Sequence, residues 1–304
     1  MENLKQFTEK VLKGVNEKVG NEFRVSITES MKNNGNKLTG ILAVPYGGIG
    51  GPCVYLDRYY KEYENGGITF PEIVDGVYSQ IMSHKDDIGD FNAACLLDWN
   101  VVKKHIYMKL VNAEKNKELL RMAPHRIFLD LAVVYYIEAN DVAGGQGVCS
   151  IMIYGQHMSI WGKDEEKLYE AAIHNMRSNG MPVFESIGGI LNNLVHGNLS
   201  ALENGGDPMD GMYVLANQRK CYGASEILDK NTLKEISDKL GGDFIALPSS
   251  IHEVIILPME GWMKYKELAS IVREVNATEV GIEEYLSDHV YVYEHGNGSL
   301  AIAA

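Results

Sequence analysis

The chain is short of cysteine and of long apolar runs, and each shortage excludes a class of protein. Four cysteines in 304 residues, with no CxxC pair, exclude a disulfide-rich scaffold, a zinc ribbon and a thioredoxin-like redox motif. No segment approaches the roughly 18 apolar residues of a membrane span, and the N-terminal stretch lacks the apolar core of a signal peptide. We therefore expect a cytoplasmic protein with four free thiols and no membrane partner.

Basic charge is also scarce. The chain has 28 Lys+Arg against 41 Asp+Glu, a net charge of -13, and residues 126–304 carry the whole excess of acids. A nucleic-acid-binding protein needs a basic face that displaces counterions from phosphates. The basic cluster within residues 103–121 is mixed with Glu114 and Glu118, so we interpret it as a solvated helix face. Direct nucleic-acid binding is not expected, although an acidic inhibitor that imitates nucleic acid stays an alternative.

Motifs of cofactor chemistry and of nucleophilic catalysis are missing. The glycine-rich stretch 47–52 has neither the spacing of a P-loop nor the dinucleotide fingerprint, and we interpret it as a linker or strand connection. The sequence contains no GxSxG elbow and no HExxH pair, and its nine histidines are dispersed. We expect no cofactor and no metal site.

The sequence does contain amphipathic helices interleaved with short strands that come in hairpins. This order predicts an α+β fold, with an antiparallel or mixed sheet built from hairpins and flanked by helices. Helices are predicted over 2–19, 70–84 and 91–120, from residue 164 onward, and around 233–240 and 268–275. Strands are predicted over 23–29, 38–44, 128–137, 148–154, 212–216, 244–247, 254–257 and 289–294. Residues 196–211 are rich in Gly, Asn and Asp and are predicted to be a loop.

Two regions follow from this order. Residues 1–125 form a helix, hairpin and helical region, and residues 126–304 form an α+β region; the two can also make one continuous domain. The apolar, β-branched run at 130–137 predicts a central strand that is buried on both faces.

The best candidates for catalytic residues are Ser249, Ser250, His252 and Glu253. A serine, a histidine and a carboxylate can act as nucleophile, base and orienting group. On an extended strand, however, His252 and Glu253 point to opposite faces, which argues against that arrangement. The alternative is structural: a turn entered at Pro248, with serine hydroxyls capping backbone groups, followed by a strand.

A second polar cluster lies further along the chain, at Asn276, Thr278 and Glu279 and then at 287–289. Asp288 with His289 suggests a metal site, but adjacent residues on a strand diverge, and turn and capping roles are favoured.

Several blocks resemble an uncharacterised bacterial family, found mainly in gut Firmicutes and known only as a domain of unknown function. The blocks are Tyr222–Ser225, Leu247–Val254, Val275–Val280 and Leu286–Tyr293, with weaker similarity at 55–56, 130–135 and 171–175. The resemblance covers about residues 40–295. It implies a bacterial, intracellular protein and brings no activity or catalytic residue.

The favoured hypothesis is a non-enzymatic accessory or binding protein, because the sequence contains no cofactor-binding loop, no metal-ligand spacing and no nucleophile elbow. Its partner is an unknown protein or small molecule. The alternatives are a hydrolase centred on Ser249–Glu253 and an acidic inhibitor of a nucleic-acid enzyme.

Overall fold

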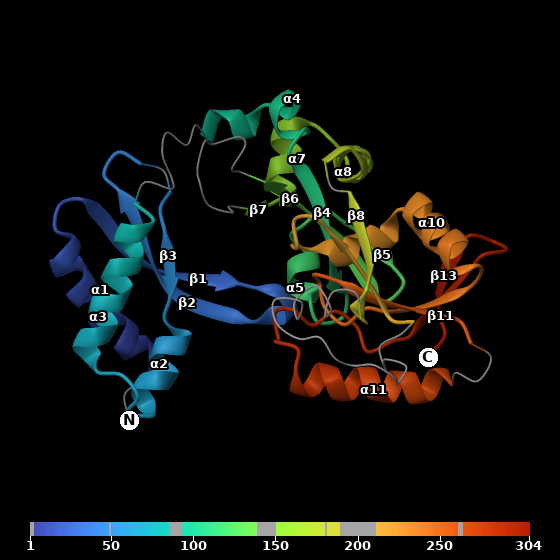
Figure 1. Cartoon of the computed structure of the whole chain (residues 1–304). Coiled ribbons are helices and arrows are strands. Elements are labelled where there is room, and N and C mark those ends of the chain that lie inside the picture. Colours follow the sequence, from blue (N-terminus) through green and yellow to red (C-terminus); the bar gives the residue numbers. More distant parts are fainter. Residues whose placement is uncertain are drawn as a thin grey trace, which may run out of the picture. The chain divides into compact units, whose positions relative to one another are not determined.

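The computed structural model describes residues 3–48, 50–85, 93–138, 150–179, 181–188, 211–260 and 264–304. The chain divides into two compact units, each considered by itself. Unit 1 is Met1–His105 with Ile137–Ile151, and unit 2 is Ile106–Tyr136 with Met152–Ala304. The division therefore places residues 106–136 with the C-terminal part, whereas the predicted regions met at residue 125. Helices and antiparallel sheets together confirm the α+β fold class (Figure 1).

Unit 1 begins with α1 and a β-hairpin, as predicted. Its elements are α1 (Leu4–Val19), β1 (Phe23–Met31), η1 (Asn33–Gly35), β2 (Lys37–Pro45), β3 (Cys53–Tyr55), α2 (Asp57–Glu64), α3 (Phe70–Ser83), η2 (Ala93–Leu97) and α4 (Trp99–Val102). Asn34 adopts a positive φ of 59° in the turn, a conformation that asparagine tolerates. The sheet order is β1-β2-β3.

The core of unit 1 forms between the sheet and two helices. Phe7, Val11 and Val15 recur on one face of α1 and are fully buried against Ile73 and Val77 of α3. Tyrosines of α2 pack on the same cluster, as their helical spacing predicts. These contacts explain why each helix is amphipathic.

The first sheet of unit 2 has the order β4-β6-β5, with β7 paired to β6. Its strands are β4 (Ile106–Asn112), β5 (His125–Phe128), β6 (Leu131–Glu138) and β7 (Ser150–Met152), of which the last two residues of β6 and the first two of β7 are counted with unit 1. The helices of this part of unit 2 are α5 (Lys117–Leu120), α7 (Gly155–Trp161) and α8 (Glu165–Asn179). Residues 131–137 are all at most 7% exposed. The predicted central strand is confirmed.

The helix predicted over 91–120 is wrong. Residues 106–112 form strand β4, and only short helices flank it. All of these residues except Lys109 are buried. A short run that is apolar on both faces has no distinguishing period, so the pattern fits a buried helix as well as a buried strand.

The second sheet of unit 2 is antiparallel, with the order β13-β12-β10-β11-β9-β8. Its elements are β8 (Pro182–Ser186), β9 (Tyr213–Asn217), η3 (Gly223–Leu228), α10 (Lys230–Leu240), β10 (Phe244–Leu247), β11 (Val254–Pro258), α11 (Tyr265–Thr278), β12 (Tyr291–Glu294) and β13 (Ser299–Ile302). The predicted strands β10 and β11 are both present and pair antiparallel, with Ala246 opposite Ile256. Strands β8 and β13 were not predicted.

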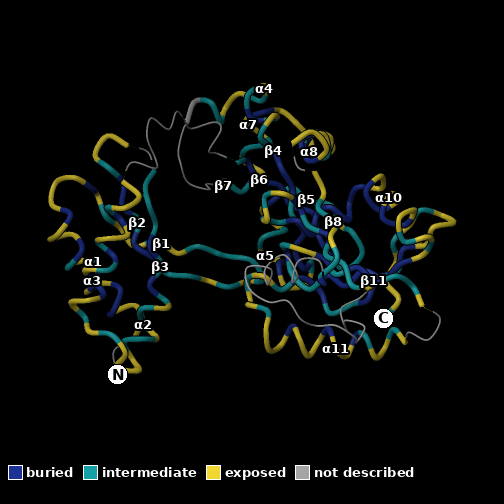
Figure 2. Tube along the Cα trace, viewed as in Figure 1, coloured by how far each residue is buried: buried dark blue, intermediate teal, exposed yellow. Residues whose placement is uncertain are grey.

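Alternate residues of this sheet face two different layers. Ile245, Leu247 and Leu257 pack against Ala269 and Val272 of α11. Figure 2 shows α11 with buried residues along one side and exposed residues along the other. The helix α10 ends where predicted, at Gly241 in the left-handed conformation.

The remaining predictions concern the loop over 196–211, the fourth cysteine and the absence of a membrane span. The Gly- and Asn-rich stretch up to residue 210 and Cys149 lie outside the described residues. Within the described ranges, the structure contains no helix with the length and apolarity needed to cross a bilayer.

Candidate functional site

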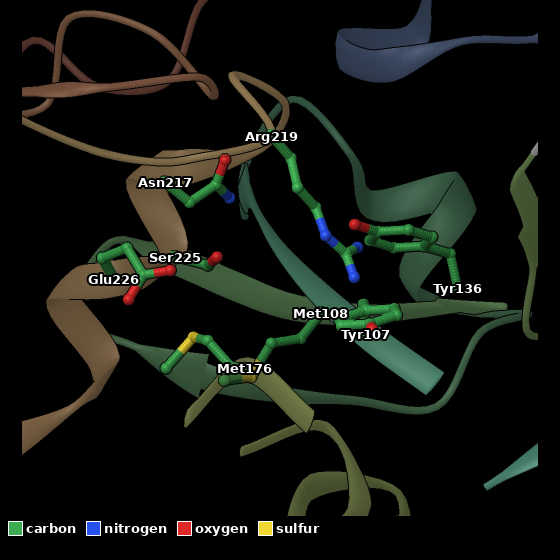
Figure 3. Close-up of a pocket in the computed structure, with 8 residues that line it drawn as sticks. All are labelled: Tyr107, Met108, Tyr136, Met176, Asn217, Arg219, Ser225 and Glu226. Carbon is green, nitrogen blue, oxygen red and sulfur yellow. The ribbon is translucent and has the colours of Figure 1, made fainter. Parts of the chain in front are cut away.

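A small pocket in unit 2 lies where β4 meets α8 and the segment after β9 (Figure 3). Its free volume is about 20 Å³, which is the size of one ordered water molecule. The lining residues are Tyr107, Met108, Tyr136, Met176, Asn217, Arg219, Ser225 and Glu226. Aromatic, thioether, cationic and acidic side chains from separate elements therefore meet at one place.

Glu226 is the most unusual of these residues. It is 1% exposed, and within the described part of the chain its Oε1 has no hydrogen-bond partner. Burial raises the pKa of Glu226 from its ordinary value of 4.5 to about 8; the nearby Asp229 carboxylate adds to the rise and Arg219 opposes it. The carboxyl group is therefore neutral below that pH, and it can donate a hydrogen bond as well as accept one.

The carboxylate of Asp229 lies close to Glu226 but has the opposite character. Burial alone would raise its pKa, but the Arg177 guanidinium and the backbone N–H of Asn231 lower it overall. Arg177 donates to both oxygens, at 3.1 and 2.8 Å, and the Asn231 N–H donates at 3.0 Å at the start of α10. Two neighbouring acids are thus held in different protonation states, which is a feature of functional sites.

Helix α8 brings Met176 and Arg177 to this place. Arg126 of β5 donates two hydrogen bonds of 2.9 Å to Glu165 at the start of α8. Further along the helix, the buried Asn175 amide donates to the carbonyl of Ile106 at 2.8 Å. These polar contacts fix the helix on the sheet, so the pocket wall is preformed.

Aromatic rings form a row along the other side of the pocket. Tyr107 and Tyr136 have ring centroids 6.0 Å apart, and Tyr222 meets the Tyr136 ring edge-on at 5.2 Å. Cations cover both ends of the row: the Arg219 guanidinium lies 3.8 Å from the Tyr107 centroid, and the Lys109 ammonium 4.5 Å from that of Tyr222. Figure 3 shows the Arg219 side chain reaching across the pocket to the two tyrosines that line it.

The turn that carries Arg219 has an unusual backbone. Lys220 and Tyr222 have positive φ angles of 53° and 55°, which cost energy in residues with a Cβ. The side chain of Asn217 spans the turn, since its Nδ2 donates to the carbonyl of Cys221 at 2.9 Å and its Oδ1 accepts the Cys221 N–H. Gly223 then passes so close to its neighbours that a Cβ would lie 2.5 Å from the His252 carbonyl oxygen. Strained turns of this kind concentrate at binding and catalytic sites.

The predicted candidates lie beside this turn but do not form a nucleophile and base. Nδ1 of His252 accepts the backbone N–H of Tyr222 at 3.2 Å, while Oγ of Ser250 accepts the backbone N–H of His252 at 3.0 Å. The backbone N–H of Ser249 donates to the Leu247 carbonyl, and Glu253 is exposed. No hydrogen bond among the described residues joins the His252 ring to a serine hydroxyl or to Glu253. The structure places His252 beside the turn, where it supports Tyr222.

The second predicted cluster forms a polar corner around Asp130. Its carboxylate accepts hydrogen bonds from Ser287 at 2.7 Å, from Nδ1 of His289 at 3.0 Å and from the Tyr291 hydroxyl. Nearby, Asn276 donates to Asp288 and to the carbonyl of Ser287, both at 2.9 Å.

This corner has no serine nucleophile. Ser287 is fully buried, and its hydroxyl lies near Nδ1 of His289, the same ring nitrogen that contacts Asp130. A serine nucleophile would contact the other ring nitrogen, Nε2. Thr278 donates to the carbonyl of Glu274 within α11, and Glu279 ends that helix. Across the described residues, no group of three or more His, Cys, Asp or Glu side chains is placed to hold a metal ion.

Residues 4–295 match the model of a family described as Family of unknown function (DUF5688). The chain belongs to this family. No curated protein and no solved structure matches the chain. The resemblance of the C-terminal blocks to an uncharacterised family is thereby confirmed, and the family brings no activity to this DUF5688 protein.

Sequence reasoning missed the acid and the cation of the pocket. Glu226 follows Tyr222–Ser225, a block noted for its resemblance, and Arg219 precedes it. The sequence did contain one sign that Glu226 is buried, because this acid interrupts the apolar residues Ala224, Ile227 and Leu228. An acid inside a short apolar segment is a candidate for burial, and burial is what gives Glu226 its chemistry.

Proposed function

We propose that this DUF5688 protein is a binding protein whose pocket in unit 2 receives a small molecule. The observation that carries the proposal is the unpartnered Oε1 of Glu226, buried at the pocket wall. A buried polar atom without a partner costs about 1–3 kcal/mol, so a ligand group that bonds it gains free energy. The aromatic and thioether walls supply apolar contact, and Arg219 supplies charge.

The small volume of the pocket is consistent with this proposal because one wall can move. Arg219 is partly exposed and belongs to a turn, whereas Glu226 is held on η3 between buried neighbours. Displacement of the Arg219 side chain from the Tyr107 ring enlarges the pocket without disturbing the sheet. The displacement gives up at least the cation–π contact with Tyr107, about 0.5–1 kcal/mol at a partly exposed site.

Methionine NMR tests the proposal directly. Met108 and Met176 line the pocket, so their ¹³C-labelled ε-methyl groups report on its occupant, and Met31 in unit 1 serves as the internal control. A chemically diverse fragment set should contain compounds that shift the Met108 and Met176 signals and leave Met31 unchanged. The Glu226→Gln variant should alter the affinity of those compounds, while Glu235→Gln, an exposed acid on α10, should not. If no fragment shifts the two signals, an ordered water is the sole occupant and the proposal fails.

A hydrolase centred on Ser249–Glu253 has weaker support. The His252 ring accepts the backbone N–H of Tyr222 and stacks on the Tyr222 ring, and Glu253 is exposed to solvent. This alternative requires Ser250→Ala to abolish an ester- or amide-cleaving activity while leaving stability unchanged. The acidic-inhibitor alternative is supported by the charge of residues 126–304 alone, and requires salt-sensitive binding to a nucleic-acid enzyme.

A cytoplasmic location belongs to the same proposal. Cys53 and Cys95 are free thiols in the structure. Free, dispersed cysteines are typical of a reducing compartment, where disulfides are rare. A thiol titration of denatured protein purified without reductant under inert gas should give four thiols, and two or fewer would contradict the location.

A further inference from the structure

We infer that the ligand of the Glu226 pocket is a small monocarboxylate, held between the Arg219 guanidinium and the carboxyl group of Glu226. This inference rests on the proposed function and names its substrate class. Both groups line the same pocket, and Figure 3 shows them on opposite sides of it. An acceptor that lies between them satisfies the unpartnered Glu226 atom and pairs with a guanidinium.

The charges around the pocket favour an anion. Arg219 already places a cation inside it, and Lys109 places a second beside the aromatic row. A cationic ligand would have to enter next to Arg219 or displace it into solvent. A planar carboxylate, in contrast, matches the fork of N–H groups that arginine presents.

The remaining walls favour one charge and a small apolar body. Met108, Met176 and the faces of Tyr107 and Tyr136 are largely apolar, and they provide no second cation for a dianion. Inorganic phosphate has no apolar body to contact these walls, and in its dianion the second charge would be desolvated without a partner. A short aliphatic or benzoic acid anion has this charge and apolar surface, and it fits once the Arg219 side chain has moved off the Tyr107 ring to enlarge the pocket.

The protonation state of Glu226 couples binding to pH. The groups that face it are the carboxylate of Asp229, itself held by Arg177, the guanidinium of Arg219 and the phenols of Tyr107 and Tyr136. With its proton, Glu226 donates a hydrogen bond to the ligand carboxylate; without it, the two anions repel. Binding is therefore strongest between the pKa of the free acid, about 4–5, and the pKa of Glu226. Above the latter value, affinity falls about tenfold per pH unit.

The test uses matched ligands that differ in charge. Acetate, propionate and benzoate are compared with acetamide and benzamide, with benzamidine, and with inorganic phosphate, by titration of the Met108 and Met176 signals at pH 6 and pH 9. Carboxylates should bind at pH 6 and lose at least tenfold in affinity at pH 9. The amides, the amidine and phosphate should bind at least tenfold more weakly than the matched carboxylate at pH 6.

Two variants separate the contributions of the two groups. Glu226→Gln keeps an N–H donor that does not ionise, so carboxylate binding should persist and become independent of pH between 6 and 9. Arg219→Gln should reduce carboxylate affinity at least tenfold, whereas Arg273→Gln, an exposed arginine on α11, should not. Arg219→Lys should recover only part of the loss because it cannot bind in a bidentate manner.

The outcomes distinguish a failure of the carboxylate inference from a failure of the proposed small-molecule binding. If amides, benzamidine or phosphate shift the two signals as strongly as carboxylates, the pocket binds small molecules and the inference about their class is wrong. Carboxylate binding that is unchanged in Arg219→Gln, or that keeps its pH dependence in Glu226→Gln, also overturns the inference. If no compound of any charge shifts the signals, the proposed function itself fails.

Discussion

The imidazole of His252 lies almost parallel to the ring of Tyr222, with centroids 5.7 Å apart and 13° between the planes. Its Nδ1 also accepts the backbone N–H of Tyr222 at 3.2 Å. Because a backbone N–H only donates, Nδ1 carries no proton and the ring hydrogen sits on Nε2. One side chain therefore supports both the ring and the strained backbone of the turn that carries Arg219.

Replacing His252 with alanine should lower thermal stability. The substitution leaves the Tyr222 N–H without its acceptor and removes the stacked ring, a loss of about 1–3 kcal/mol. Ser250→Ala removes only an acceptor for the His252 N–H and should change stability by less than about 1 kcal/mol. Chemical denaturation of both variants checks the order. A His252→Ala protein that unfolds like the wild type but loses a cellular phenotype would contradict the supporting role.

Gly223→Ala should be strongly destabilising. The new Cβ would lie 2.5 Å from the His252 carbonyl oxygen and 2.7 Å from the Asn217 nitrogen, and both are backbone atoms that cannot turn aside. Overpacking of this kind costs about 1–3 kcal/mol or more. Gly281→Ala is the control, because its Cβ meets no atom within 4 Å. Equal melting temperatures for the two variants would show that the turn can move away from His252.

Glu226→Gln should stabilise the protein in a manner that depends on pH. Folding holds the Glu226 pKa at about 8, whereas the unfolded chain has the ordinary value of 4.5. The free energy of unfolding of the wild type therefore falls as pH rises from about 4.5 to about 8, by about 1.4 kcal/mol per pH unit at most. Glutamine does not titrate, so the difference in unfolding free energy between the variant and the wild type grows over this pH range. The difference becomes constant above about pH 8. Denaturant titrations from pH 4 to 9 measure it, and a constant difference across the range would refute the raised pKa.

Asp130→Asn should destabilise unit 2. The carboxylate accepts from Ser287, His289 and Tyr291, and an amide cannot accept all of these bonds. Hydrogen bonds to a charged group contribute about 1.5–3 kcal/mol each, so a loss of several kcal/mol is expected. Asp238→Asn breaks an exposed pair with Lys234 on α10 and should change stability far less, because solvent screens a surface ion pair. A similar small effect in both variants would mean that solvent replaces the bonds of Asp130.

Lys220→Gly should stabilise the protein slightly. Lys220 is exposed and has a φ of 53°, a conformation that glycine adopts without a steric penalty. The relief of steric strain, about 1 kcal/mol, exceeds the free-energy cost of the larger backbone entropy that glycine has in the unfolded chain. The measurement is the midpoint of denaturation, with Lys220→Ala, which keeps the Cβ, as the control. A lower midpoint for the glycine variant would indicate that the lysine side chain stabilises the turn.

Local signals in the sequence were sufficient for much of the fold. Asn34 and Gly35 predict the first hairpin, and Gly241 predicts the end of α10, because a positive φ is a property of a single residue. β4 could not be recognised in the same way. Its side chains are buried on both faces of an edge strand by α8 and η3, so nothing in its own seven residues distinguishes a strand from a buried helix.

The site was harder to predict because its chemistry arises from distant parts of the chain. The segment around His252 was a predicted candidate, but His252 contacts Tyr222, which lies 30 residues earlier in the chain. Glu226 has an ordinary side chain until Tyr107, Met176 and Asn217 surround it. A raised pKa is a property of that surrounding, and no spacing of residues encodes it.

The Asp130 corner also sets an order of events for a chain that is being synthesised. Asp130 leaves the ribosome 157 residues before Ser287 and 161 before Tyr291. Until then the β5–β6 turn presents an ionised carboxylate to water. Strand β12, which begins at Tyr291, is also the partner of β10. Closure of this corner is therefore a late step that depends on contacts of long sequence separation, the kind that fold slowly. A ribosome that stops before residue 287 releases a chain in which both the carboxylate and the β10 edge are unpaired.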